Sequence, residues 1–351
     1  MKKRIQIDGK WIGEGEKTYI VAEVSANHLQ DYGRAEAIIR AAADAGADAV
    51  KLQTYTPDTI SLDCDNDYFI RVNQGTIWEG TSEYQLYQEA YTPWEWQPKL
   101  KAFAETLGLA CFSSPFDGTA VDFMREMDMP AYKVASYEIN DIPLIRKIAR
   151  IGKPVIIATG VAYLADIERA VAACQEEGNE QVMILKCTSA YPSPYEDMNI
   201  SVIPHMAETF DALTGLSDHS MGSAVAVAAT ALGAKMVEKH LTLSRADGGP
   251  DGAFSMEPAE FAHMVEEIRI VEKAVGKVTY ELTESQKRSR EDMRSLFAVR
   301  DIRAGETFTE ENVRSIRPGF GLAPVYYEEV LGRQAKTDIA KGTPLAWKHI
   351  M

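Results

Sequence analysis

The chain has 351 residues, which is enough for one large domain of about 250 residues and a second, smaller one. Its 52 acidic and 37 basic residues give a formal charge of -15 at pH 7, which argues against nucleic acid and against an anionic membrane as partners. An anionic substrate would therefore need a local cluster of cations and amide groups.

The first residues predict a hairpin. In the segment from Arg4 to Gly13, apolar and polar residues alternate around Asp8-Gly9, a pair typical of a tight two-residue turn. The beginning of the chain is basic, but no apolar signal region follows it, and no stretch of about 18 apolar residues occurs later. The four cysteines follow no metal or disulfide spacing, so we expect reduced thiols and a cytoplasmic protein.

Eight short apolar or β-branched runs follow in regular alternation with helix-like stretches. The runs span residues 18–25, 47–54, 110–116, 131–136, 154–160, 182–189, 212–219 and 235–242. Helical apolar spacing occurs in 34–46, 96–108, 119–128, 142–152, 165–178 and 222–233. Repeated strand-then-helix units require a parallel sheet, and eight of them close into a (β/α)8 TIM barrel. The hairpin is expected to plug or flank the bottom of this barrel.

One connection is far longer than the others. Nearly forty residues separate Tyr55 from Thr92, whereas a loop from strand to helix usually has about 2 to 6. The insertion carries Trp78 and an aromatic run from Tyr84 to Trp96. We expect most of these rings to pack on the barrel wall and one or two to line a pocket.

The C-terminal part predicts a separate small domain. A long helix is expected from Glu257 to Val275, followed by the charged stretch from Glu281 to Glu291. The segments 301–308 and 338–345 resemble each other, which indicates an internal pseudo-twofold repeat. The expected organisation is a barrel domain at 1–280 with the N-terminal hairpin, a linker at 281–293 and a small domain at 294–351.

Two histidines end consecutive predicted strands. His219 follows the seventh strand and His240 the eighth, so both imidazoles would lie at one mouth of the barrel, where they can share a metal ion. Such a metal could polarise a carbonyl group while Glu23 or Asp251 orients the substrate or moves protons. The alternative is that both histidines simply form hydrogen bonds.

Five more strand-end residues would ring the same mouth. Two ammonium groups and three hydroxyls suit a phosphate, and they are supplied by Lys51, Ser114, Lys133, Ser136 and Ser217. For each of them alone, solvation or helix capping is an alternative interpretation. Lys186, in an apolar run, is a candidate for a Schiff base of the aldolase type.

The strand ends and the loops after them carry a series of motifs: AEVSANH at 22–28, KLQT at 51–54, SSPFD at 113–117, YKVAS and YEIND at 132–141, ATG at 158–160, TSAYPSPYEDMN at 188–199, GLSDHSMG at 215–222, EKHLT at 238–242 and GPD at 249–251. With these motifs the chain resembles, over nearly its whole length, the sialic acid synthase family, the phosphoenolpyruvate-dependent synthases of nonulosonic acids. The stretches 294–306 and 316–322 resemble the antifreeze-like (SAF) domain of these enzymes.

This resemblance implies a set of site residues and partners. It implies a divalent metal, Mn²⁺ or Mg²⁺, on His219 and His240, and phosphoenolpyruvate on the five residues that ring the mouth. Glu23 and Glu138 are the expected catalytic carboxylates, and an acylamino sugar is expected near Gln53, Tyr191, Asp251 and Arg317. Members of the family are domain-swapped homodimers, so Arg317 would reach the partner's site. Ala158 departs from the pattern because neuraminate synthases commonly have a serine there.

The implied reaction joins C3 of phosphoenolpyruvate to the aldehyde of the open-chain sugar. Water then adds at C2, and phosphate leaves by cleavage of the C–O bond. The stretches 76–80 and 86–96 resemble the pseudaminic acid synthase branch more than the neuraminate branch. The alternatives are an N-acetylneuraminate or legionaminate synthase, and a non-catalytic sugar-binding or polysaccharide-assembly protein that keeps the barrel.

Overall fold

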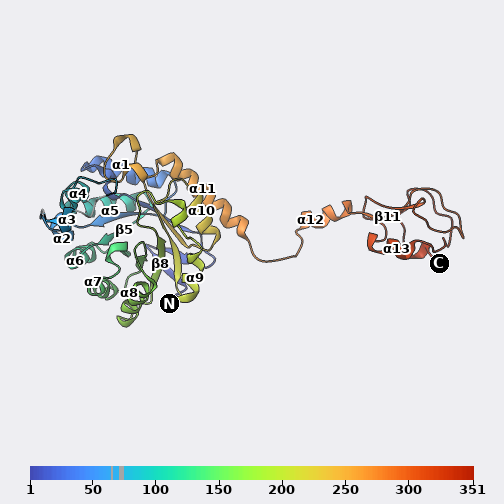
Figure 1. Ribbon diagram of the computed structural model, residues 1–351, viewed down its shortest axis with the longest axis horizontal. Coiled ribbons are helices and arrows are strands. Elements are labelled where there is room, and N and C mark those ends of the chain that lie inside the picture. Colours follow the sequence, from blue (N-terminus) through green and yellow to red (C-terminus); the bar gives the residue numbers. More distant parts are fainter. Residues whose placement is uncertain (65, 71–74) are drawn as a thin grey trace. The chain divides into compact units, whose positions relative to one another are not determined.

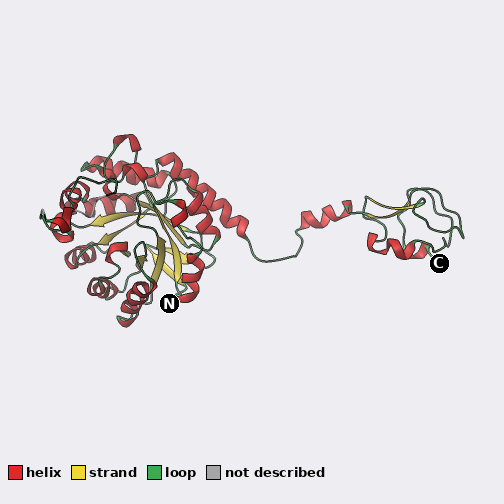
Figure 2. Cartoon of the chain, viewed as in Figure 1, coloured by secondary structure: helices red, strands yellow, loops and turns green. Residues whose placement is uncertain are grey.

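The computed structural model describes residues 1–64, 66–70 and 75–351, and the chain divides into a unit at Met1–Gly276 and a unit at Lys277–Met351. The first unit is the predicted (β/α)8 barrel, with the parallel strands enclosed by helices (Figures 1 and 2). Going round the closed barrel, the order is β10-β3-β4-β5-β6-β7-β8-β9. The strands are β3 (Tyr19–Glu23), β4 (Ala49–Thr54), β5 (Ala110–Pro115), β6 (Tyr132–Val134), β7 (Val155–Ala158), β8 (Val182–Cys187), β9 (Leu213–Asp218) and β10 (Met236–His240).

Helices follow the strands in the alternation that the sequence predicts. They are α1 (Tyr32–Asp44), α5 (Gln97–Thr106), α6 (Gly118–Glu126), α7 (Ile142–Ala149), α8 (Leu164–Glu176), α9 (Val202–Thr209), α10 (Ala224–Ala231) and α11 (Pro258–Val275). Local capping fixes several starts: the side chains of Asp31, Asp117 and Asp141 accept backbone N–H groups at the beginning of α1, α6 and α7. Helix α9 was not predicted.

The bottom of the barrel is closed by the predicted hairpin. Strands β1 (Arg4–Ile7) and β2 (Lys10–Gly13) pair antiparallel, and Asp8 and Gly9 between them both have positive φ, as a tight hairpin turn requires. Ile5, Ile7 and Ile12 are buried in one cluster with apolar residues from the barrel strands. The barrel interior is therefore apolar at the end that the hairpin closes. Polar side chains can lie at the other end, where the strands have their carboxyl ends.

The described part of the long insertion contains the short helices α2 (Pro57–Ile60), α3 (Asp67–Ile70) and α4 (Glu83–Ala90). Ser82 caps α4 by accepting the backbone N–H of Gln85. Trp94 stacks on Phe123 of α6, with the ring centroids 4.7 Å apart. Part of the predicted aromatic run thus packs on the barrel wall, as expected.

The second unit contains α12 (Glu284–Ser289), β11 (Ser295–Ala298), β12 (Val313–Ile316) and α13 (Tyr327–Val330), so the segment predicted as a linker holds a short helix. Its two sequence repeats meet through reciprocal contacts: Ile302 and Ile339 exchange backbone hydrogen bonds of 2.8 Å in both directions. Asp338 accepts the N–H of Ala304, and Asp301 accepts the N–H of Lys341. These contacts confirm the predicted internal repeat.

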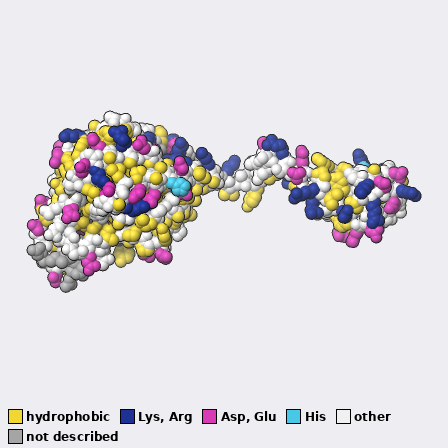
Figure 3. Space-filling view, turned by 90° about the horizontal axis from the view of Figure 1, so that it is seen from above, with side chains coloured by type: hydrophobic (Ala, Val, Ile, Leu, Met, Phe, Trp, Pro, Cys, Tyr) yellow, Lys and Arg dark blue, Asp and Glu magenta, His cyan; other side chains and the backbone are white. Residues whose placement is uncertain are grey.

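Figure 3 shows how charged side chains are distributed on one face of the molecule. Acidic and basic side chains are interspersed on the face of the barrel unit that Figure 3 shows. In the described part of the chain, no helix has the length and apolarity needed to cross a membrane.

Candidate active site

A cavity of about 460 Å³ opens where the carboxyl ends of the strands meet. Side chains alternate along each strand, so every second residue points into the barrel. The predicted residues Lys51, Ser114, Lys133, Ser136, Ser217, His219 and His240 all line this cavity, together with Gln53, Glu138, Tyr191 and Asp251. The structure thus brings these residues together at one mouth.

A buried group of alternating charges forms the floor of the site. Glu23 pairs with Lys51, its register partner on β4, and Lys133 pairs with Glu238 at 2.5 Å. The Lys51 ammonium lies 3.7 Å from the same Glu238 oxygen, so Glu238 lies between the two lysines. All four side chains are at least 94% buried. Two ammonium groups held at the end of a cavity make a site for an anion.

Hydroxyl groups surround the two lysines. Lys51 Nζ lies 3.4 Å from Ser114 Oγ, and Lys133 Nζ donates to Ser217 Oγ at 3.2 Å. Ser136 Oγ accepts the backbone N–H of Gly160 at 3.0 Å. Ala158, at the end of β7, is buried and offers no hydroxyl.

The two histidines have side chains that suit a metal ion. His219 donates from Nδ1 to the carbonyl of Thr188 at 3.0 Å, so in the neutral ring Nε2 carries the lone pair that a metal ion needs. His240 Nδ1 is buried and has no hydrogen-bond partner among the described residues. Burial and the nearby His219 hold the pKa of His240 well below its usual value, so this ring is neutral at pH 7. The two ring centroids lie 5.3 Å apart.

A metal at this position would need ligands from outside the protein. Within residues 1–64, 66–70 and 75–351, no group of three or more His, Cys, Asp or Glu side chains is arranged to hold an ion. A centre with two imidazoles would leave coordination positions for substrate or water oxygens, which suits a catalytic rather than a structural metal.

Two carboxyl groups have pKa values suited to proton transfer. Burial raises the pKa of Glu23 to about 7, although Lys51 opposes the shift. Burial likewise raises the pKa of Glu138 to about 7. One oxygen of Glu138, Oε2, is buried without a hydrogen-bond partner among the described residues. Both groups can therefore exchange a proton near neutral pH.

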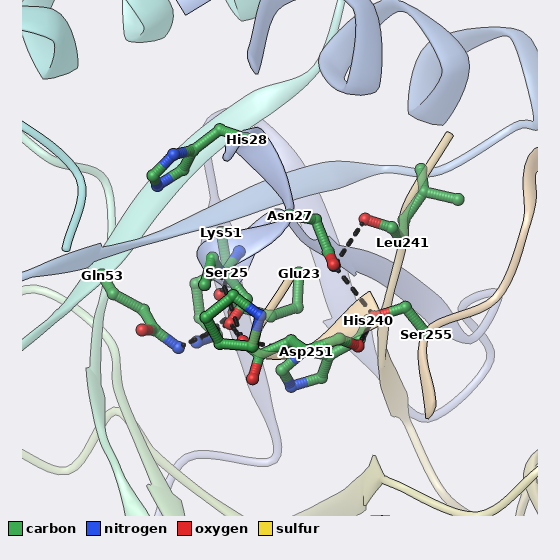
Figure 4. A network of polar contacts seen from close by, with 12 residues as sticks. Glu23, Ser25, Asn27, His28, Lys51, Gln53, His240, Leu241, Asp251 and Ser255 are labelled. Carbon is green, nitrogen blue, oxygen red and sulfur yellow. Dashed lines mark hydrogen bonds and ion pairs between the residues drawn. The ribbon is translucent and has the colours of Figure 1, made fainter. Parts of the chain in front are cut away.

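Asp251 joins the site through a polar network on the barrel rim (Figure 4). Ser25 Oγ hydrogen-bonds to Asp251, and Gln53 donates to Ser25 Oγ at 3.2 Å. Asp251 Oδ2 lies 4.0 Å from Nδ1 of His240. Burial raises the pKa of Asp251, and the hydrogen bond from Ser25 opposes the rise.

Aromatic side chains form the outer wall of the cavity. Tyr191 contacts both the His219 ring, at 4.5 Å between centroids, and the Trp78 ring, at 5.5 Å. The indole N–H of Trp78 donates to the carbonyl of Pro250 at 2.9 Å. Tyr87 of α4 packs edge-on against Tyr55. The expectation that one or two rings of the insertion line a pocket is confirmed by Trp78 and Tyr87.

The structure departs from the sequence expectations at Lys186. This residue alternates on β8 with Leu185, which belongs to the interior cluster, so its side chain faces out of the barrel. Its ammonium donates to the Cys187 carbonyl at 2.6 Å and does not line the cavity. The Schiff-base alternative at Lys186 is therefore wrong.

Arg317 does not lie in the same unit as the other predicted site residues. It belongs to the second unit and is exposed there, so its role stays a prediction. Glu238, Cys187 and Ser25 are among the lining residues that were not proposed as site residues. The sequence did contain a signal for Glu238. Side chains two residues apart on a strand point to the same face, so Glu238 should share the inward face with His240, as Ser217 shares it with His219 on the neighbouring strand.

Known proteins resemble this chain over nearly its whole length. Residues 38–280 match the NeuB family, and residues 293–351 match the SAF domain. Pseudaminic acid synthase of Campylobacter jejuni is 43% identical over 94% of this chain and 96% of its own length. Pseudaminic acid synthase of Helicobacter pylori is 42% identical over 93% and 96%. The crystal structure of the spore coat polysaccharide biosynthesis protein SpsE of Bacillus subtilis superposes with a TM-score of 0.68 at 34% identity and covers 99% of both chains.

Proposed function

The chain belongs to the NeuB family, and from this premise we propose that it condenses phosphoenolpyruvate with 2,4-diacetamido-2,4,6-trideoxy-L-altrose to give pseudaminic acid and phosphate. The similarity to pseudaminic acid synthases supports this substrate pair. The observation that carries the proposal is one cavity whose floor holds two buried lysines and whose outer wall is aromatic. An enzyme that consumes phosphoenolpyruvate and has free thiols fits the cytoplasm.

Phosphoenolpyruvate would lie at the floor of the cavity, beside the two buried lysines. Lys51 and Lys133 supply charge for its phosphate and carboxylate, and the hydroxyls of Ser114, Ser136 and Ser217 supply directional hydrogen bonds. Because Glu23 and Glu238 neutralise the lysines in the free protein, the anion replaces part of these ion pairs when it binds. The two carboxylates thereby hold both ammonium groups at the floor of the cavity before the anion binds.

The acylamino sugar would lie above it, between the Ser25 network and the aromatic wall. Gln53 and Asp251 can bind its polar groups, while Tyr191 and Trp78 offer apolar surface to a 6-methyl and an acetyl group. His219 and His240 would hold a divalent cation. When bound, such a cation supplies Lewis acidity for the sugar carbonyl.

Proton transfer falls to the two carboxyl groups. The new C–C bond joins C3 of phosphoenolpyruvate to the aldehyde carbon, water adds to C2, and phosphate leaves with the former C2 oxygen. Glu138 has an unpartnered oxygen and a pKa of about 7, which suits it to take the proton of that water. Glu23 is the rival for this role, although its ion pair with Lys51 makes it less free.

The proposal is tested by phosphate release. Incubation with phosphoenolpyruvate and a panel of acylamino hexoses should release phosphate only when a suitable sugar is present. A non-catalytic sugar-binding protein would bind a sugar without releasing phosphate, and this result would reject the proposal.

We also propose a domain-swapped homodimer in which Arg317 reaches the partner's site. The second unit exposes large apolar side chains, with Phe320 at 65% and Val325 at 80%, and so small a domain gains stability by covering them. Mixing Arg317→Ala protein with Lys51→Ala protein should restore activity after subunit exchange, because each hybrid dimer has one intact composite site.

With random exchange, half of the dimers are hybrids and each has one working site, so about a quarter of the wild-type activity is expected. Each variant alone, taken through the same exchange, is the control. Verified exchange with no recovery would reject the swapped arrangement.

A further inference from the structure

Ser25 has an unusual backbone conformation at the rim of the site. Its φ is 47°, in the left-handed region that glycine adopts easily and serine rarely does. The residue follows β3, is 1% exposed and lines the cavity. Strained residues held at a functional site point to a role for the side chain or for the conformation itself.

The hydroxyl of Ser25 uses both of its hydrogen-bonding capacities. A carboxylate only accepts, so Ser25 donates to Asp251, and an amide nitrogen only donates, so Ser25 accepts from Gln53 at 3.2 Å (Figure 4). The backbone N–H of Ser25 donates separately to Glu23 Oε1 at 2.9 Å. Ser25 is therefore hydrogen-bonded to three side chains of the site, those of Glu23, Gln53 and Asp251.

Asp251 depends on this hydroxyl. The Asp251 carboxylate also accepts the backbone N–H of Ala26, the residue after Ser25, but this contact is long at 3.3 Å. The backbone of the loop that carries Asp251 is held elsewhere: Trp78 donates to the Pro250 carbonyl at 2.9 Å, and Ser255 donates to the Asp251 carbonyl at 2.7 Å. The hydroxyl of Ser25 therefore acts on the Asp251 side chain and not on the course of the loop. Glycine at position 25 would remove the backbone strain, but it would leave both Gln53 and Asp251 without their common partner.

We infer that Ser25 is a positioning residue whose hydroxyl fixes Gln53 and Asp251 for the second substrate, the acylamino sugar. This inference rests on the proposed function for the identity of that substrate. The KM for phosphoenolpyruvate should not depend on the hydroxyl. The backbone N–H of Ser25 donates to Glu23, which pairs with Lys51, and a substitution of the side chain keeps this N–H.

The test compares Ser25→Ala with Ser25→Gly. Alanine keeps the strained conformation without the hydroxyl, whereas glycine removes both. Loss of a hydrogen bond to a charged group corresponds to about 10- to 100-fold, so both variants should raise the KM for the sugar by that factor. The KM for phosphoenolpyruvate should stay unchanged. Thr230→Ala, which removes a buried hydroxyl bonded to Ala226 within α10, is the matched control.

Crystal structures of the wild type and of Ser25→Gly add a readout that is independent of turnover. The Asp251 side chain should leave its wild-type rotamer in the variant. An unmoved Asp251 would overturn the inference, as would an unchanged sugar KM, a Gly variant with wild-type kinetics, or equal increases in both KM values. A wild type that releases no phosphate with any sugar would instead reject the proposed function, and the crystal structures would still test Ser25.

Discussion

Chelation of divalent cations is expected to abolish turnover. The His219 and His240 rings lie close together in the cavity, and the buried Nδ1 of His240 lacks a partner among the described residues. A Lewis acid at such a position contributes several kcal/mol, so the loss should be on the order of 10³-fold or more. Adding back Mn²⁺ or Mg²⁺ should restore the rate, and the cation that restores it better identifies the preferred metal.

The histidines can be tested without turnover. Mn²⁺ binding, followed by electron paramagnetic resonance, should weaken strongly in His240→Ala and in His219→Ala. His205 is exposed on α9 and away from the cavity, so His205→Ala should bind the ion like the wild type. Full activity after exhaustive chelation would refute a metal-dependent reaction.

Replacement of Lys133 by methionine is expected to have a comparably large effect. The change removes one of the two ammonium groups at the floor and leaves Glu238 with the Lys51 ammonium at 3.7 Å and the Ser217 hydroxyl at 3.3 Å. Removing one partner of a buried ion pair destabilises a protein by about 3 to 5 kcal/mol, and kcat/KM for phosphoenolpyruvate should fall by about 10²- to 10³-fold. Thermal unfolding and steady-state kinetics measure the two effects.

A second substitution separates stability from function. Lys133→Met/Glu238→Gln removes the poorly paired carboxylate, so it should recover part of the lost stability and none of the activity. Lys147 on α7 forms a partly exposed pair with Asp122, and Lys147→Met is the control that should leave both quantities nearly unchanged. If Lys133→Met kept the wild-type kcat/KM for phosphoenolpyruvate, the floor of the cavity could not be the site that binds this substrate.

The barrel could be predicted because β-branched runs and helical spacing alternate eight times in the chain. Helix α9 escaped prediction because the proline-rich segment before it and Pro204 inside it hide the helical pattern. The expectation that one or two rings of the insertion line a pocket came from its length and its aromatic residues. Its short helices carry too little periodicity to be recognised, and residues 65 and 71–74 lie outside the described part.

The direction of side chains was the main limit at the site. Barrel strands are apolar on both faces, so the sequence does not show which of two neighbouring residues points inward. Lys186 was therefore considered for chemistry, whereas Cys187 is the residue that lines the cavity. Glu238 was passed over beside His240, although both lie on the same face of β10. Ser25 matters through its backbone angle, which no sequence pattern revealed.

The measurement that tests the central proposal most directly is a comparison of specificity constants for two sugars. A methyl contact in an apolar pocket favours one substrate by about 1 to 3 kcal/mol, and a specific hydrogen bond to the second acetamido group would add to this. We therefore predict that kcat/KM for 2,4-diacetamido-2,4,6-trideoxy-L-altrose exceeds that for N-acetylmannosamine by at least about 10-fold. An equal or higher value for N-acetylmannosamine would contradict the proposal and assign the chain to the neuraminate branch.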